Sequence, residues 1–155
     1  MLKEYIGDIL KSRATYICHQ VNCRGAMNSG LAKHIKNKYP KVYDEYKVRV
    51  NKAKLEDPHL EDFGLLGRVL AVDVGDCTIL NCFSQNYYGK DGKRYTDYVA
   101  LQICLNSIYS HLMPNERVAF PYKFGCGLGG GNWEVVKKMI AETFNDKEVE
   151  IWRME

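Results

Sequence analysis

The sequence lacks the features that mark several large classes of protein. Its six cysteines form no C-x-x-C pair, so neither a zinc site nor a disulfide framework is favoured. No apolar stretch approaches the ~20 residues of a membrane-spanning helix. The net charge is only +3, from 22 basic and 19 acidic residues, which is too mild to indicate a general nucleic-acid-binding protein. With 46% hydrophobic and 26% charged residues, the composition indicates an ordinary globular protein.

The cysteines and the first residues point to a reducing compartment. Most of the cysteines lie in apolar runs such as 77-CTILNCF-83, where free cysteine packs as a small hydrophobe. The first ten residues are too charged for a signal peptide. We therefore expect a cytoplasmic protein, with one domain over residues 1–155, that acts as a monomer without a metal, a cofactor or a membrane partner.

Short β-branched and aromatic runs alternate with helical periodicity along the chain. Strands are expected at 2–6, 15–21, 66–74, 77–84, 117–121 and 148–153, with a hairpin turn at 75–76. Helices are expected at 29–38, 41–51, 97–112 and 132–145, and loops at 51–64 and 84–98. This order predicts an α/β fold, a three-layer α/β/α sandwich around a mixed, mostly parallel sheet of about six strands.

A glycine-rich stretch, 118-VAFPYKFGCGLGGGNWEVV-136, joins an expected strand to an expected helix. Such a loop presents backbone N–H groups to an anion beside the positive end of a helix. It is no P-loop, because no Gly-Lys-Ser/Thr follows, and no β-α-β unit follows to make it a dinucleotide fingerprint. Phosphate binding is one interpretation, and a purely structural turn is the other.

A second strand–loop–helix junction lies within 16-YICHQVNCRGAMNSGLAKHIKNKYP-40. An apolar strand leads to Asn22, then to a loop of small residues, then to a helix. Two such loops on either side of one cleft would suit a pyrophosphate between two sugars.

Several motifs together resemble the macrodomain family, which binds ADP-ribose, over nearly the whole chain. They are Gly7-Asp8-Ile9, Val21-Asn22, 28-NSGLA-32, Phe120-Pro121 followed by 125-GCGLGG-130, and Trp152. The segments 22-NCRG-25 and 92-GKRYT-96 are typical of a small bacterial and phage branch. That branch is similar to the yeast-type ADP-ribose-1″-phosphate phosphatase and to the terminal ADP-ribose protein glycohydrolase.

The resemblance implies a role for each matching residue. Asp8 and Ile9 would bind adenine, Trp152 would stack near it, and Asn22 would face the distal ribose. One loop (Asn28, Ser29, Gly30, Leu31) would donate to the diphosphate, and the other (Gly125, Cys126, Gly127, Leu128, Gly129) would grip it and the distal ribose. Three alternatives stay open: Asp8 as a turn or helix cap, Asn22 as a side chain bonded to backbone, and Trp152 as a core residue.

The chain departs from the glycohydrolase pattern at both reactive positions. Gly129 stands where that branch has an aspartate, and Gln85 stands where it has a lysine. Lys90 and Lys93 in the next loop are the candidate substitutes for this lysine. His19 matches a histidine of both enzymes and is either catalytic, since imidazole titrates near neutrality, or packed between sheet and helix. The loop 84–98 either overhangs the distal ribose or is mobile in solvent.

Three functions follow from the resemblance. The first expectation is an ADP-ribose-1″-phosphate phosphatase, because His19 persists while the glycohydrolase pair is absent. The second is an ADP-ribosyl hydrolase that removes ADP-ribose from protein or nucleic acid, with a water held by Asn22 and the glycine loop. The third is a module that binds ADP-ribose without catalysis. A nucleic acid is an expected partner only when it is ADP-ribosylated.

Overall fold

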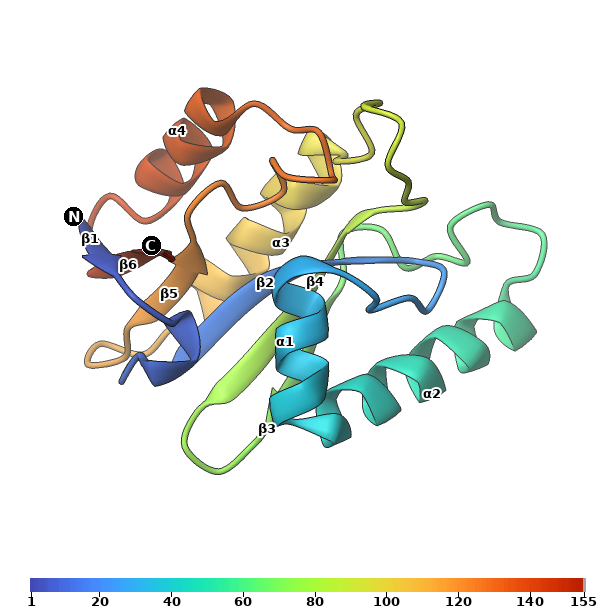
Figure 1. Cartoon of the computed structure of the whole chain (residues 1–155), viewed down its shortest axis with the longest axis horizontal. Helices are drawn as coiled ribbons and strands as arrows, with labels where there is room; N and C mark the ends of the chain where they lie inside the picture. Colours follow the sequence, from blue (N-terminus) through green and yellow to red (C-terminus); the bar gives the residue numbers. More distant parts are fainter. Residues whose placement is uncertain (155) are drawn as a thin grey trace.

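The computed structural model describes residues 1–154 and contains one six-stranded sheet with helices on both faces (Figure 1). The strands are β1 Leu2–Ile6, β2 Tyr16–Asn22, β3 Val69–Asp73, β4 Thr78–Gln85, β5 Val118–Pro121 and β6 Val149–Arg153. The helices are the 3-10 turn η1 Ile9–Lys11, then α1 Gly30–Lys38, α2 Pro40–Glu56, α3 Tyr98–His111 and α4 Trp133–Thr143.

The sheet has the strand order β1-β6-β5-β2-β4-β3. Every neighbouring pair is parallel except β3 and β4, which form an antiparallel hairpin. Gly75 lies in the hairpin turn with φ of +98°, a conformation that favours glycine. The predicted mixed, mostly parallel sheet and its turn are therefore confirmed.

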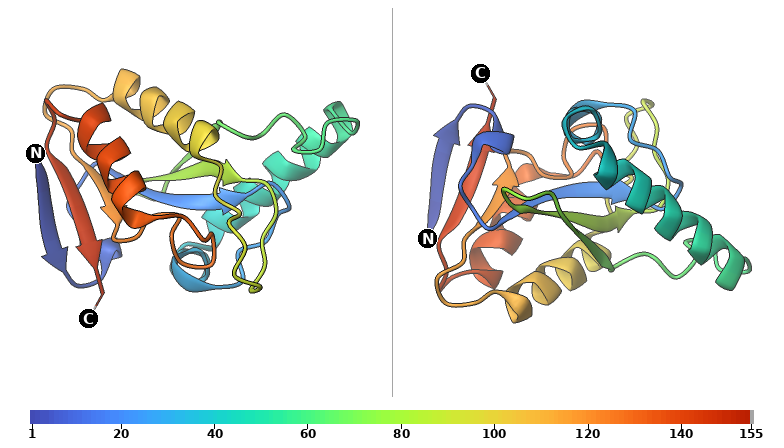
Figure 2. Two further views of the ribbon diagram at one scale, coloured as in Figure 1. Left: turned by 90° about the horizontal axis from the view of Figure 1, so that it is seen from above. Right: turned by 90° about the horizontal axis from the view of Figure 1, so that it is seen from below.

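Two hydrophobic cores lie on opposite faces of the sheet. Side chains alternate along β2, so that Ile17 and Val21 face α1 and α2, whereas Cys18 faces α3 and α4. Figure 2 shows these two helix pairs on opposite sides of the sheet. The predicted three-layer sandwich is confirmed.

Helix α2 is longer than the sequence pattern predicted. The expected loop at 51–64 is wrong for residues 51–56, which continue the helix. Val42, Tyr46, Val50 and Ala53 are all buried, so the inward stripe extends beyond the predicted end at 51. The helix stops before Pro58, because a proline disfavours helical backbone at the residue before it.

The parallel strands bring their carboxyl ends to one edge of the sheet. Asn22, Gln85 and Pro121 end three strands, β2, β4 and β5, that run in the same direction side by side. Ligands of open α/β sheets bind beyond this edge. Within residues 1–154, none of the helices has the length and apolarity that crossing a membrane requires.

Candidate functional site

A cleft of about 500 Å³ lies at the carboxyl edge of the sheet. The loop after β2 and the loop after β5 form two of its walls. Their lining residues are Asn28, Ser29, Gly30 and Leu31 from the first loop and Gly125, Gly127, Leu128 and Gly129 from the second. Both candidate anion-binding loops thus border a single cleft, while Cys126 is not among its lining residues.

The first wall contains the start of a helix. Ser29 precedes α1, and Gly30 and Leu31 form its first residues. The first N–H groups of a helix have no partner within it, and they carry the positive end of the helix dipole. Gly30 has φ of +58° and no atom within 4 Å of where a Cβ would stand, so the backbone is open to a ligand there.

The charges that line the cleft are all positive. Lys90 and Lys123 are its ionised side chains, and within residues 1–154 no aspartate or glutamate lines it. The cleft also contains His19, whose pKa is lowered to about 4, so this imidazole is neutral at pH 7. The electrostatics therefore favour an anionic ligand.

His19 lies on β2 with only 2% of its surface exposed. Its Nε2 is 2.5 Å from Asn81 Oδ1. Since Asn81 donates its Nδ2 to Leu70 O, its Oδ1 is the acceptor and His19 is protonated on Nε2. Burial lowers the pKa of His19, and the hydrogen bond to Asn81 raises it by a smaller amount. The Nδ1 atom is buried without a partner, which leaves one acceptor on a residue that lines the cleft.

Asn22 lines the cleft but directs its polar atoms to its own loop. Its Oδ1 accepts from Arg24 N–H and from the Tyr46 hydroxyl, both at 2.9 Å, and its Nδ2 donates to Ala26 O at 2.9 Å. This is the backbone-bonded arrangement that the sequence left open as the alternative. The contact of Asn22 with a distal ribose stays a prediction.

Asp8, Ile9 and Trp152 are not among the residues that line the cleft. Asp8 caps η1, since its Oδ1 accepts from Leu10 N–H at 2.9 Å, and its Oδ2 lies 3.2 Å from His34 Nε2. Burial raises the pKa of Asp8, but these bonds outweigh it and hold the pKa below its ordinary value.

Trp152 stacks on Tyr5 with ring centroids 4.9 Å apart and donates to Glu150 at 2.8 Å. Its backbone pairs in register with Pro121, which lines the cleft. Ile9 is buried in the core. The adenine contacts of these residues stay predictions.

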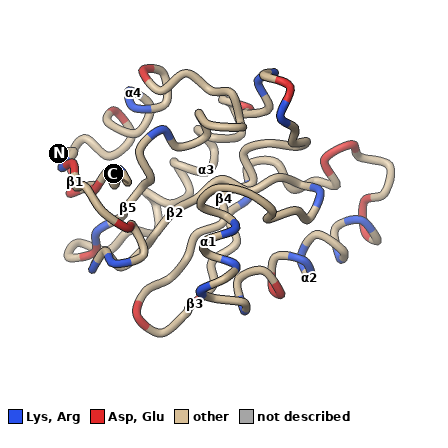
Figure 3. Tube along the Cα trace, viewed as in Figure 1, with Lys and Arg blue, Asp and Glu red and all other residues tan. Residues whose placement is uncertain are grey.

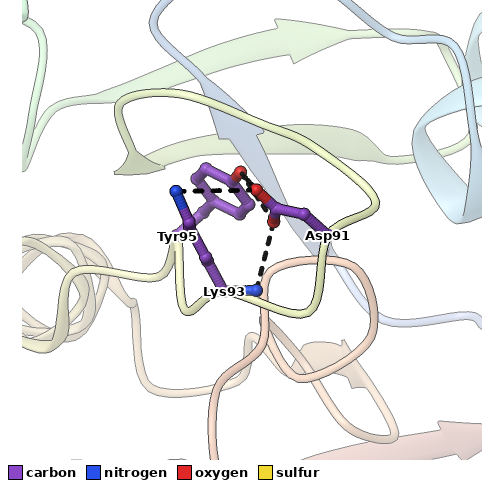
Figure 4. Close-up of polar contacts among 3 residues, drawn as sticks. All are labelled: Asp91, Lys93 and Tyr95. Carbon is purple, nitrogen blue, oxygen red and sulfur yellow. Dashed lines mark hydrogen bonds and ion pairs between the residues drawn. The ribbon is translucent and has the colours of Figure 1, made fainter.

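The loop after β4 covers the opposite end of the cleft, where Tyr88, Gly89 and Lys90 line it. This loop is folded on itself, as Figure 4 shows. Asp91 accepts from Lys93 N–H at 3.1 Å and from the Tyr95 hydroxyl at 2.8 Å. Of the two candidate substitutes for the missing lysine, Lys90 lines the cleft. Lys93 does not line it, and its Nζ lies 3.9 Å from Asp91 Oδ2.

Sequence reasoning missed Gln20, which lines the cleft from β2 and hydrogen-bonds with Gln85 at 2.6 Å. Its position two residues before Asn22, near the end of a strand, was the available signal. No group of three histidine, cysteine, aspartate or glutamate residues is placed to hold a metal ion anywhere in residues 1–154.

Comparison with known proteins identifies relatives along almost the whole chain. The DNA ADP-ribosyl glycohydrolase of Mycobacterium tuberculosis is 27% identical over 143 residues, which cover 89% of this chain but 37% of that protein. The chain thus spans little more than a third of the length of this curated relative. No protein-family model matches the chain.

Two solved structures share its architecture. The macrodomain of Thermus aquaticus DarG superposes with a TM-score of 0.77 at 23% identity, over 100% of this chain and 98% of that one. Thermosipho africanus DarTG, in complex with ADP-ribose, superposes with a TM-score of 0.75 at 21% identity, over 97% of this chain and 41% of that one. These likenesses show a common fold.

Proposed function

Because the chain has the macrodomain fold that its sequence motifs indicated, we propose that it binds ADP-ribose and hydrolyses the bond between ADP-ribose and a carrier, with DNA as the preferred carrier. The named activity of the mycobacterial relative supports this hydrolase over the phosphatase that the motifs placed first. The phosphatase was favoured because His19 persists. A buried, neutral His19 with a pKa of about 4 gives that preference little support.

One observation supports the proposal: a cleft with cationic side chains, and with no carboxylate from residues 1–154, lies between the two candidate anion-binding loops. The diphosphate is assigned to the space between the start of α1 and the loop Gly125–Gly129. Backbone N–H groups there approach an anion without a side chain between them, and Lys90 and Lys123 add charge. The adenine is assigned to the end beside Trp152, and the distal ribose to the end beneath Lys90.

The reaction at the distal ribose breaks the bond between its anomeric carbon and the carrier. A water adds to that carbon and releases a proton to solvent, while the carrier leaves with the bonding electrons and takes up a proton from solvent. His19 Nδ1 is assigned the role of hydrogen-bond acceptor from this water or from a ribose hydroxyl, because it is a buried acceptor without a partner and His19 lines the cleft. Lys90 is assigned the role of the reactive amine, because it lines the cleft and the resemblance implies that Gln85 replaces the lysine of the glycohydrolase branch.

A second candidate is a module that binds ADP-ribose without turnover. The absence of any lining carboxylate in residues 1–154 favours it, because no strong general base faces the distal end.

A turnover panel separates these functions. The protein is incubated with an ADP-ribosylated oligonucleotide, an ADP-ribosylated protein and ADP-ribose-1″-phosphate, and the products are separated by chromatography. We expect free ADP-ribose from the oligonucleotide and no phosphate from the phosphorylated sugar. Lys90→Ala is expected to slow release by roughly 100-fold, the lower end of the range for losing one group that acts in the transition state. Lys93→Ala is the matched control and should not change the rate.

Each contrary result points to another function. ADP-ribose binding without any release identifies a binding module. Phosphate release restores the phosphatase. If ADP-ribose does not bind at millimolar concentration, the proposed function is wrong.

A further inference from the structure

Gln20 joins three segments that meet at the cleft. Its Nε2 is 2.6 Å from Gln85 Oε1, at the end of β4, and 2.9 Å from Thr96 Oγ1, in the loop before α3. Its Oε1 accepts from the Ser84 hydroxyl at 2.6 Å. Thr96 in turn donates its hydroxyl to Gly125 O at 2.6 Å. The side chain therefore links β2, β4 and the glycine loop.

The hydrogen bonds admit one orientation of the Gln20 carboxamide. The Thr96 hydroxyl hydrogen is used on Gly125 O, so the Thr96 oxygen must accept from Gln20. The other Gln20 N–H then donates to Gln85 Oε1, and Gln85 donates its own Nε2 to Tyr87 O at 2.8 Å. The Gln85 carboxamide is thus held at both ends, in the position where the family's lysine is expected.

The same contact explains why residue 129 is a glycine. A Cβ at Gly129 would lie 2.7 Å from Gln20 Nε2, from Thr96 Oγ1 and from Gly125 O. Gly129 O also accepts from the N–H groups of Tyr95 and Thr96 at 2.7 and 2.9 Å. The space that an aspartate side chain would enter is filled by Gln20 and its partners.

We propose that Gln20 is a positioning residue for the distal end of the cleft: it holds the Gln85 carboxamide and the peptide of Gly125 in the arrangement that binds the distal ribose. This inference rests on the proposed function, since it takes ADP-ribose as the ligand. The side chain acts through Gln85 and Gly125. Because Gln20 fills the space beside Gly129, no aspartate side chain fits at position 129.

Calorimetry with two ligands tests this role. AMP contains the adenine end of ADP-ribose and lacks the distal ribose. In Gln20→Glu the side chain keeps its size but cannot donate to Thr96 or Gln85. We expect about tenfold or greater weakening for ADP-ribose, the usual effect of losing one or two buried hydrogen bonds, and a change within about twofold for AMP.

Gln102→Glu is a matched control. Gln102 also donates its Nε2 to one amide oxygen and one hydroxyl, those of Asn106 and Thr143, both at 2.9 Å, but it does not line the cleft. It should leave both affinities unchanged. Ser84→Ala, which removes one donor to Gln20, is the milder variant if Gln20→Glu does not fold, and it should weaken ADP-ribose binding severalfold with AMP unaffected.

The results separate this inference from the function beneath it. Wild-type-like ADP-ribose binding by Gln20→Glu, or by Ser84→Ala where Gln20→Glu does not fold, overturns it. Equal weakening for ADP-ribose and AMP also overturns it, because a general structural role would affect both ends of the cleft. If the wild-type protein binds neither ligand, the proposed function is wrong and this inference is wrong with it.

Discussion

Replacing Gly129 with alanine tests the packing of the glycine loop. The added methyl would lie 2.7 Å from three atoms, and one of them is the backbone carbonyl oxygen of Gly125. Rotation of Gln20 or Thr96 relieves two of these contacts, but the third requires the main chain to move. Forcing a methyl into a packed site costs ~1–3 kcal/mol, and we expect the upper end here because backbone must shift.

The matched control is Gly127→Ala in the same loop. No atom lies within 4 Å of a Cβ at Gly127. Alanine there should leave stability unchanged or raise it by ~0.4–1 kcal/mol, since it reduces the freedom of the unfolded chain. The two variants add the same methyl to the same loop, so their difference isolates the close contact at Gly129.

Urea unfolding followed by tryptophan fluorescence measures the difference. We expect Gly129→Ala to be less stable than Gly127→Ala by about 3 kcal/mol, which corresponds to roughly 6–12 °C in Tm for a chain of this size. Equal stabilities would refute the argument that the loop is glycine-rich because it packs against Gln20 and Thr96.

Three further predictions concern other parts of the site. Tyr46→Phe should cost ~1–3 kcal/mol in urea unfolding, because the buried hydroxyl accepts from Gly25 N–H and donates to Asn22, and wild-type stability would contradict this. The free energy of unfolding should fall by roughly 3 kcal/mol as the pH drops from 6.5 to 4, because the unfolded chain protonates His19 while the folded chain holds the pKa of His19 near 4. His19→Gln should reduce this loss, and an equally steep pH profile would refute the assignment of a lowered pKa to His19. Asp8→Ala should weaken ADP-ribose binding in calorimetry by ~1–3 kcal/mol, and unchanged affinity would refute the adenine assignment.

The fold was largely predictable because local pattern and packing agree in most elements. Strand β2 alternates its side chains between two cores, and α4 lies within the predicted range 132–145, with Asn132 as its cap accepting from Glu134 N–H at 2.9 Å. The end of α2 was predicted too early. The residues from Asn51 onward are mostly polar, so the sequence pattern does not indicate that Ala53 is buried and that the helix continues.

The candidate site was predictable at its loops and not in its interior. The small-residue loops after β2 and β5 are local sequence features, and both line the cleft. The contacts of Gln20 are to residues that lie 64, 65 and 76 positions away in the sequence, and they depend on the register of β2 against β4. No spacing within the sequence predicts such a contact, so the reason for Gly129 emerged only from the structure.

The central claim is that the two loops bind ADP-ribose together. It is tested most directly by titrating ¹⁵N-labelled protein with ADP-ribose and following the backbone amide resonances. Saturable shifts are expected at both Asn28–Leu31 and Gly125–Gly129, with the amides at the far end of α2 unaffected. Absence of any shift at millimolar ligand, or shifts confined to residues away from both loops, would contradict it.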